Sequence, residues 1–143
     1  MFSFFKKKPD PKPTVDLGFS KAQIASIICA LMVIAKCDGN VAIKELKYIS
    51  DMCDALGISQ SDSMVTAAMK GGKGPMLATL NTLTRSQKEW LIIAIHGVVH
   101  ADGKVVQIEL DYAQALFEQI GVSAQEYIYN VQKAQAIAQQ LGQ

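Results

Sequence analysis

DGNVAIKEL at residues 38–46 returns as DGKVVQIEL at residues 102–110, and this duplication organises the whole chain. The match extends outward from both copies at a constant offset. Tyr48 is repeated as Tyr112, and the Gly-Ile-Ser of residues 57–59 returns as the Gly-Val-Ser of residues 121–123. Similarity at a fixed offset is typical of a duplicated structural unit. We therefore expect two repeats, at about residues 20–70 and 84–134.

Helix-capping residues recur at the same offset. Ser20-x-x-Gln23 and Thr84-x-x-Gln87 match the capping box, in which two side chains satisfy free N–H groups at a helix start. The sequence also places Ser59-x-x-Asp62 and Ser123-x-x-Glu126 at helix starts, where a carboxylate suits the helix dipole. Gly57 and Gly121 are expected to end the preceding helices in the left-handed conformation. Each repeat is thus predicted to be helix, Asp-Gly loop, helix, glycine turn, helix.

The second helix of each repeat carries apolar residues at the three- and four-residue spacing of one buried face. These residues are Leu46, Ile49, Met52, Cys53 and Leu56 in the first repeat, and Leu110, Ala113, Leu116, Phe117 and Ile120 in the second. Between the repeats we expect a flexible connector at residues 71–75 and one small helix at 76–83. No segment alternates with period two, so we predict an all-α, compact bundle of about seven helices.

The amino-acid composition excludes several classes of protein. The 143 residues suit one domain, half of them are apolar, and the net charge of +1 is too balanced for a nucleic-acid-binding protein. Three cysteines without a C-x-x-C pair predict neither a disulfide framework nor a thiolate zinc site. We interpret Cys29 and Cys53 as core thiols and expect a cytoplasmic protein.

The segment 1–18 is rich in Phe, Lys and Pro, and we predict a disordered tail there, before a single helical domain at 19–143. Its lysines follow the phenylalanines, unlike a secretory signal. Weak contact of this tail with an anionic membrane surface is the alternative. The longest apolar stretch elsewhere covers only positions 22–35, which is shorter than a membrane span needs to be.

The repeated D-G-x-V-x-x-x-E pattern coincides with the second half of a calcium-binding EF-hand loop, in which the Asp and the closing Glu are ligands. Its first-half ligand positions hold apolar or basic residues instead, namely Ile34, Lys36, Val98 and His100. In the structural alternative, the Asp carboxylates accept hydrogen bonds from N–H groups of their loops. The Glu carboxylates accept hydrogen bonds from N–H groups at the start of the following helix. It places Val41 and Val105 in the core.

The double Asp-Gly pattern with its Glu-Leu and Gly-[Ile/Val]-Ser elements resembles the TerB-like domains of tellurite-resistance proteins and the N-terminal domain of the DjlA co-chaperone. The resemblance covers about residues 19–131. It implies a seven-helix bundle with pseudo-two-fold symmetry, a bacterial stress-response role, and divalent-metal binding at the loops. The matching acids are Asp38, Glu45, Asp102 and Glu109. Many family members carry further acids where this chain has residues 43–44 and 107–108.

His96 and His100 are four residues apart, a spacing that places both imidazoles on one helical face. His100 precedes the second loop and joins the four acids as a candidate metal ligand. No set of nucleophile, base and oxyanion donor is evident, so we do not expect an enzyme. The sequence predicts a protein-interaction module with an unidentified protein partner. The alternative is a divalent-metal sensor or buffer.

Overall fold

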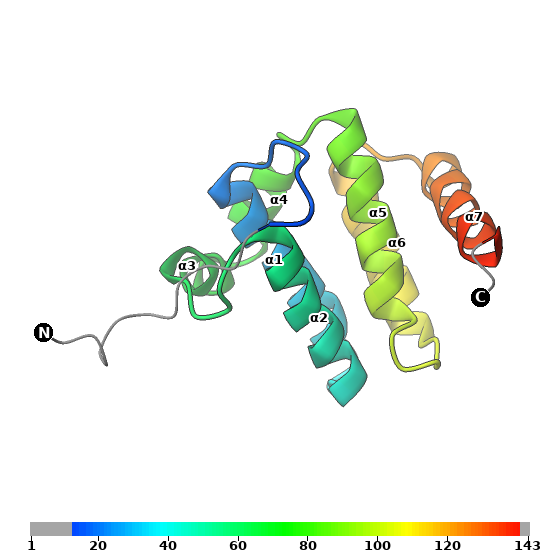
Figure 1. Ribbon diagram of the computed structural model, residues 1–143, viewed down its shortest axis with the longest axis horizontal. Helices are drawn as coiled ribbons and strands as arrows, with labels where there is room; N and C mark the ends of the chain where they lie inside the picture. Colours follow the sequence, from blue (N-terminus) through cyan, green and yellow to red (C-terminus); the bar gives the residue numbers. More distant parts are fainter. Residues whose placement is uncertain (1–12, 141–143) are drawn as a thin grey trace, which may run out of the picture.

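The computed structural model describes residues 13–140, apart from the side chains of residues 137–139. Over this part of the chain it contains helices and no strand, which confirms the predicted all-α bundle (Figure 1). The helices are α1 (Lys21–Lys36), α2 (Ile43–Leu56), α3 (Ser63–Gly71), α4 (Lys73–Leu80), α5 (Arg85–Val99), α6 (Gln107–Gln119) and α7 (Ala124–Gln140). In the described chain, no helix combines the length and the apolar character needed to cross a bilayer.

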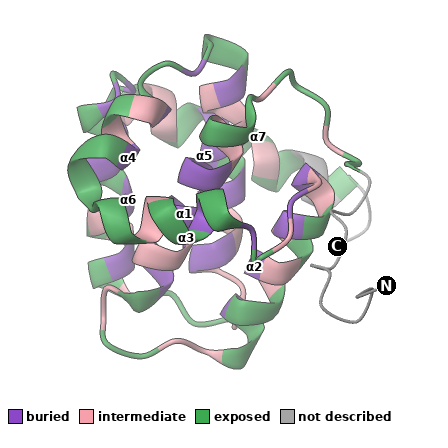
Figure 2. Cartoon of the chain, turned by 90° about the vertical axis from the view of Figure 1, so that its left-hand side faces the viewer, coloured by how far each residue is buried: buried purple, intermediate pink, exposed green. Residues whose placement is uncertain are grey.

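The core is built around α1 and α5, which pack against each other. Helix α1 also contacts α2, α3, α4 and α6, whereas α5 contacts α2, α6 and α7. Buried residues therefore gather on these two central helices, and the surrounding helices carry more exposed surface (Figure 2). The fully buried side chains include Ile27, Leu31 and Ile34 from α1, and Leu91, Ile92 and Ile95 from α5. The two halves share one core.

Both predicted capping boxes are confirmed. The Ser20 hydroxyl accepts from the Gln23 N–H at 3.1 Å and the Gln23 side chain accepts from the Ser20 N–H at 2.9 Å. The same pair of bonds opens α5, at Thr84 and Gln87. Gly57 and Gly121 have φ of 77° and 82°, so the left-handed helix ends are also confirmed.

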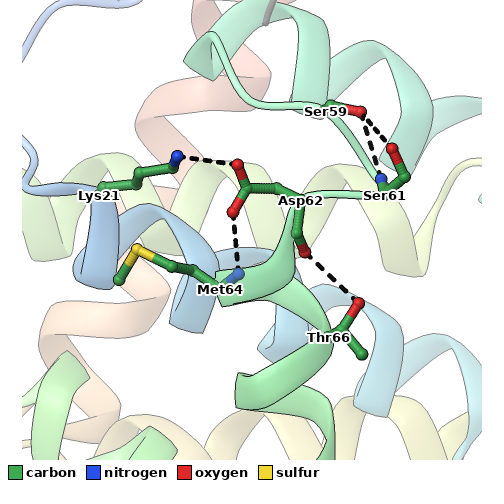
Figure 3. Close-up of polar contacts among 6 residues, drawn as sticks. All are labelled: Lys21, Ser59, Ser61, Asp62, Met64 and Thr66. Atoms are coloured by element: carbon green, nitrogen blue, oxygen red, sulfur yellow. Dashed lines mark hydrogen bonds and ion pairs between the residues drawn. The ribbon is translucent and has the colours of Figure 1, made fainter. Parts of the chain in front are cut away.

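Helix α3 begins later than the repeat predicts, and Ser59 does not cap it. Asp62 is the N-cap, and its Oδ1 accepts from the Met64 N–H at 2.8 Å (Figure 3). The Ser59 hydroxyl instead accepts from the Ser61 N–H at 3.2 Å, within the turn before the helix. In the second half, the Ser123 hydroxyl does accept from the Glu126 N–H, at 3.1 Å. The predicted cap is therefore wrong at Ser59 and confirmed at Ser123.

The predicted connector at residues 71–75 is mostly helical. Only Gly72 separates α3 from α4, and its φ of 83° gives the reversal that a glycine permits. Pro75 lies in the first turn of α4, where a missing N–H breaks no intrahelical bond. Helix α4 accordingly spans Lys73–Leu80 rather than the predicted 76–83.

Ion pairs link the first and third helix of each half. The Lys21 ammonium lies 2.8 Å from Asp62 Oδ2 (Figure 3), and the Arg85 guanidinium lies 2.6 Å from Glu126 Oε2. Arg85 and Glu126 are the residues that the repeat offset matches with Lys21 and Asp62. The starts of α5 and α6 match the starts of α1 and α2 at the same offset. The pseudo-two-fold symmetry of the halves in space stays a prediction.

Contacts with the bundle begin before the predicted domain boundary at residue 19. The N–H groups of Thr14 and Val15 both donate to the Ala55 carbonyl, at 2.8 and 2.9 Å. The Gln87 side chain donates to the Leu17 carbonyl at 2.8 Å, and the Phe19 ring lies 5.4 Å from that of Trp90. Residues 1–12, which hold the rest of the predicted tail, lie outside the described residues.

Candidate functional site

The two Asp-Gly loops have the same turn. Asp38 Oδ1 accepts from the Asn40 N–H and Asp102 Oδ1 accepts from the Lys104 N–H, both at 3.0 Å. Gly39 and Gly103 have φ of 85° and 78°, a conformation that glycine adopts without strain. Each Asp therefore stabilises its own loop, as the structural interpretation predicts.

The valines of the loops differ from each other. Val41 is partly buried and packs against the core, as predicted. Val105 is 47% exposed, so its predicted place in the core is wrong. The next residue, Val106, is the N-cap of α6 and is less exposed than Val105. The second loop thus directs Val105 toward solvent.

The closing glutamates of the two loops meet in the interior. Glu45 is 3% exposed and Glu109 is 2% exposed, and their side chains are hydrogen-bonded to each other. Glu45 Oε1 also accepts from the Ala42 N–H at 3.0 Å, so the predicted helix-start role of Glu45 is confirmed. For Glu109, the structure shows a bond to the glutamate of the other repeat. A bond between two carboxyl groups requires a proton on one of them.

The electrostatics of this glutamate pair favour a retained proton. The pKa of Glu109 is raised to about 8 by burial, by the hydrogen bond with Glu45 and by the charge of that residue. The negative charges of Asp38 and Asp102 raise the pKa further. All four predicted loop acids therefore interact in one region, which their separation in sequence does not reveal.

No three His, Cys, Asp or Glu side chains within residues 13–140 are placed so that they could hold a metal ion. His100 Nδ1 lies 2.9 Å from the His96 carbonyl oxygen, and the two imidazole rings are 4.0 Å apart. Burial and the charge of His100 lower the pKa of His96. The role of the four acids and His100 as metal ligands stays a prediction.

Cys37 lies beside the acidic pair. Its pKa is raised by burial and then by the negative charges of Glu109 and Asp38. A raised pKa keeps the group as a thiol, which is a weaker nucleophile than a thiolate. Cys29 and Cys53 are buried free thiols, as predicted.

A second feature, an apolar groove, lies on the first half of the molecule. We call it the α2–α3 groove: a cavity of about 660 Å³ lined by α1, α2 and α3. Its apolar lining includes Ile28, Met32, Leu46, Ile49, Val65 and Met69. Lys47 and Lys70 add two cationic groups, and Ile43, 85% exposed, stands on the α2 side.

This groove was not predicted, because the spacing of the apolar residues places Leu46 on the buried face of α2. Leu46 is 44% exposed, so that prediction is wrong. Ile49 and Cys53, further along the predicted face, are buried. A signal was present in the sequence, since Ile43 and Leu46 lie three residues apart and form a second, adjacent apolar stripe.

Comparison of the chain with protein-family models, with curated proteins and with solved structures finds no match.

Proposed function

We propose that this chain is a non-enzymatic, TerB-like helical module of the bacterial cytoplasm that binds a protein partner in a stress response of the tellurite-resistance type. The family and the pathway rest on the resemblance of the two Asp-Gly loops. The observation that carries partner binding is the α2–α3 groove, with its exposed Leu46 and Ile43. Concave sites with a mostly apolar lining are the usual form of binding sites in proteins.

The groove also has the composition of a recognition surface. Its base is rigid, because Ile28 and Ile49 belong to the buried core. Its Met32 and Met69 side chains are unbranched and adapt to the shape of a partner. A rigid apolar base with adaptable edges buries a partner's side chains at low cost in conformational entropy.

The experiment is chemical crosslinking in cells followed by isolation of the tagged full chain. We expect a defined set of crosslinked proteins with the wild type, lost when Leu46→Glu places a charge in the groove. Ile128→Glu is the matched control, since Ile128 is also an exposed apolar residue but lies on α7. Thermal unfolding must show that both variants fold. The same crosslinks in both variants would contradict groove-mediated binding.

A divalent-cation site is the second candidate, favoured by the bond between Glu45 and Glu109 and by the interaction of Asp38 and Asp102 with Glu109. The side chains would have to move closer together around the ion, because no three of them are placed to hold one in the described chain. A cation bound there would displace the shared proton, because hard cations take deprotonated carboxylates. Binding would therefore release a proton and tighten as the pH rises toward 8.

An amide NMR titration of metal-stripped protein with calcium, then zinc, tests this second candidate. Saturable shifts confined to residues 36–46 and 100–110, absent in Glu109→Gln, would support a sensor or buffer. No shift at millimolar metal would reject it and leave the loops as structural elements.

A further inference from the structure

We infer that the α2–α3 groove receives an amphipathic helix of acidic character from the partner, an inference that rests on the proposed function. Helices α2 and α3 both pack on α1. The groove is lined by all three, with the buried Ile28 of α1 at its base. Two helices that flank a third in this way offer a site for a further helix, whose apolar face the groove would cover.

The size of the groove suits several side chains from one helix. An amphipathic helix presents apolar residues at positions i, i+3 or i+4, and i+7, all on one face. The volume of about 660 Å³ has room for such a row. The partner would bury Leu46 together with Met32 and Met69.

In the second half of the molecule, the leucine equivalent to Leu46 is less exposed. Leu110, the counterpart of Leu46, is partly buried and packs against the core. There α6, the counterpart of α2, packs directly against α7. In the first half, α3, the counterpart of α7, leaves Leu46 44% exposed. A helix from a partner would give Leu46 the burial that Leu110 has within the chain.

Charge around the groove selects an acidic helix. Lys47 and Lys70 line it, and no Asp or Glu is among its lining residues in the described chain. Lys47 also pairs with Asp51 at 3.2 Å, but both side chains are well exposed and such pairs are weak. Carboxylates flanking the partner's apolar residues would gain attraction from both lysines, whereas a basic helix would be repelled.

The test uses the full chain and two labelled helical peptides, each long enough for about five turns. Both carry the same leucine positions, and the flanking positions are Glu in one peptide and Lys in the other. Fluorescence anisotropy near physiological salt measures each affinity. We expect saturable binding of the Glu peptide, about tenfold or more tighter than the Lys peptide. Amide shifts should centre on Leu46 and Met69.

Charge reversal supplies the specificity control. The double variant Lys47→Glu/Lys70→Glu keeps the apolar lining but should reverse the preference between the two peptides. Leu46→Glu should abolish binding of both. Equal affinity for the two peptides, or no binding of either, would overturn the acidic-helix inference, as would shifts confined to other helices.

Other occupants give different outcomes. Laurate that shifts the groove signals while the peptides do not would identify a small anionic amphiphile, and binding only to anionic vesicles would identify a membrane surface. Either result overturns the inference. If neither peptide binds but Leu46→Glu still removes the cellular crosslinks, the proposed function is supported and only the acidic-helix inference is rejected. If neither peptide binds and the crosslinks persist in Leu46→Glu, both the proposed groove-mediated function and the acidic-helix inference are rejected.

Discussion

Glu45 and Glu109 come from the first turns of α2 and α6, in different repeats, yet they share a hydrogen bond in the interior. Two ionised carboxylates at this burial would each lose hydration and would repel each other. A proton on one of them removes the repulsion and makes it a hydrogen-bond donor to the other. The protonated pair avoids this repulsion, so it should respond to pH and to any cation that replaces the proton.

The first prediction concerns the pH dependence of stability. The pKa of Glu109 is about 8 in the folded protein and 4.5 as a free side chain. The folded state therefore binds the proton more tightly, and this contribution to stability is lost as the pH rises from about 4.5 to 8. Glu109→Gln cannot ionise, and its amide still donates to Glu45. The variant should lose less stability than the wild type between pH 5 and 8, by a difference of a few kcal/mol.

Urea unfolding at several pH values measures this difference. His96 acts in the opposite direction, because its lowered pKa makes stability rise with pH, but that contribution is common to both proteins. Glu118→Gln is the control, since Glu118 lies exposed on the same helix. Parallel pH profiles for the wild type and Glu109→Gln would show that the shared proton contributes nothing to stability.

The second prediction concerns Gly97, where α5 lies against Tyr48 of α2. A Cβ atom at Gly97 would overlap the ring and hydroxyl of Tyr48. Gly97→Ala should therefore lower the free energy of unfolding by about 1–3 kcal/mol, a typical cost of overpacking. Gly74→Ala is the control, because nothing lies within 4 Å of a Cβ there. It should be neutral or stabilise α4 by up to about 1 kcal/mol. Equal effects in denaturant unfolding would argue against a close approach of the two helices.

Helix α3 shows how one short element depends on its first residue. It has 9 residues, fewer than an isolated helix needs for stability in water. Its start is fixed by Asp62, which caps the helix with Oδ1 and pairs with Lys21 of α1 through Oδ2. Because α3 supplies Val65 and Met69 to the α2–α3 groove, this single carboxylate also positions one side of the candidate site.

The third prediction separates the two roles of Asp62. Asp62→Ala removes both the cap and the ion pair and should lower the free energy of unfolding by about 1–2 kcal/mol. Lys21→Met removes the ion pair, in which Lys21 is half exposed, but keeps the Asp62 cap, and should cost less than about 1 kcal/mol. Hydrogen exchange should accelerate in α3 but not in α5 with Asp62→Ala. An equal cost for the two variants would mean that the ion pair, rather than the cap, fixes α3.

At the scale of the whole molecule, α1 and α5 join the two halves into one core. Helices α3 and α7 lie at opposite ends of the bundle, and both depend on these central helices for burial (Figure 1). A duplicated chain with two separate cores would unfold in two steps. The shared core instead favours a single cooperative transition.

The fourth prediction tests this cooperativity. Leu31→Ala removes a fully buried side chain from α1 and should cost about 2–5 kcal/mol. Trp90 lies in α5, in the other half, and reports on that half by fluorescence. The midpoint of its urea transition should move as far as that of the circular dichroism signal, which reports on all helices. A Trp90 transition unmoved by Leu31→Ala would show that the halves unfold independently.

Most helix ends and both loop turns could be predicted from the amino-acid sequence, because their signals are local. Ser20 with Gln23, Thr84 with Gln87, and the left-handed glycines each act within a few residues, so their neighbours suffice to predict them. The role of Asp38 and Asp102 in their own turns is local for the same reason.

The candidate site itself could not be predicted, because it depends on contacts between distant segments. The bond between Glu45 and Glu109 depends on how two distant helices approach each other, which no window of sequence encodes. The exposure of Leu46 depends on how α2 and α3 are arranged on α1, since its spacing fits a buried stripe equally well. Burial and proton sharing are properties of contacts between segments, and packing alone fixes those contacts.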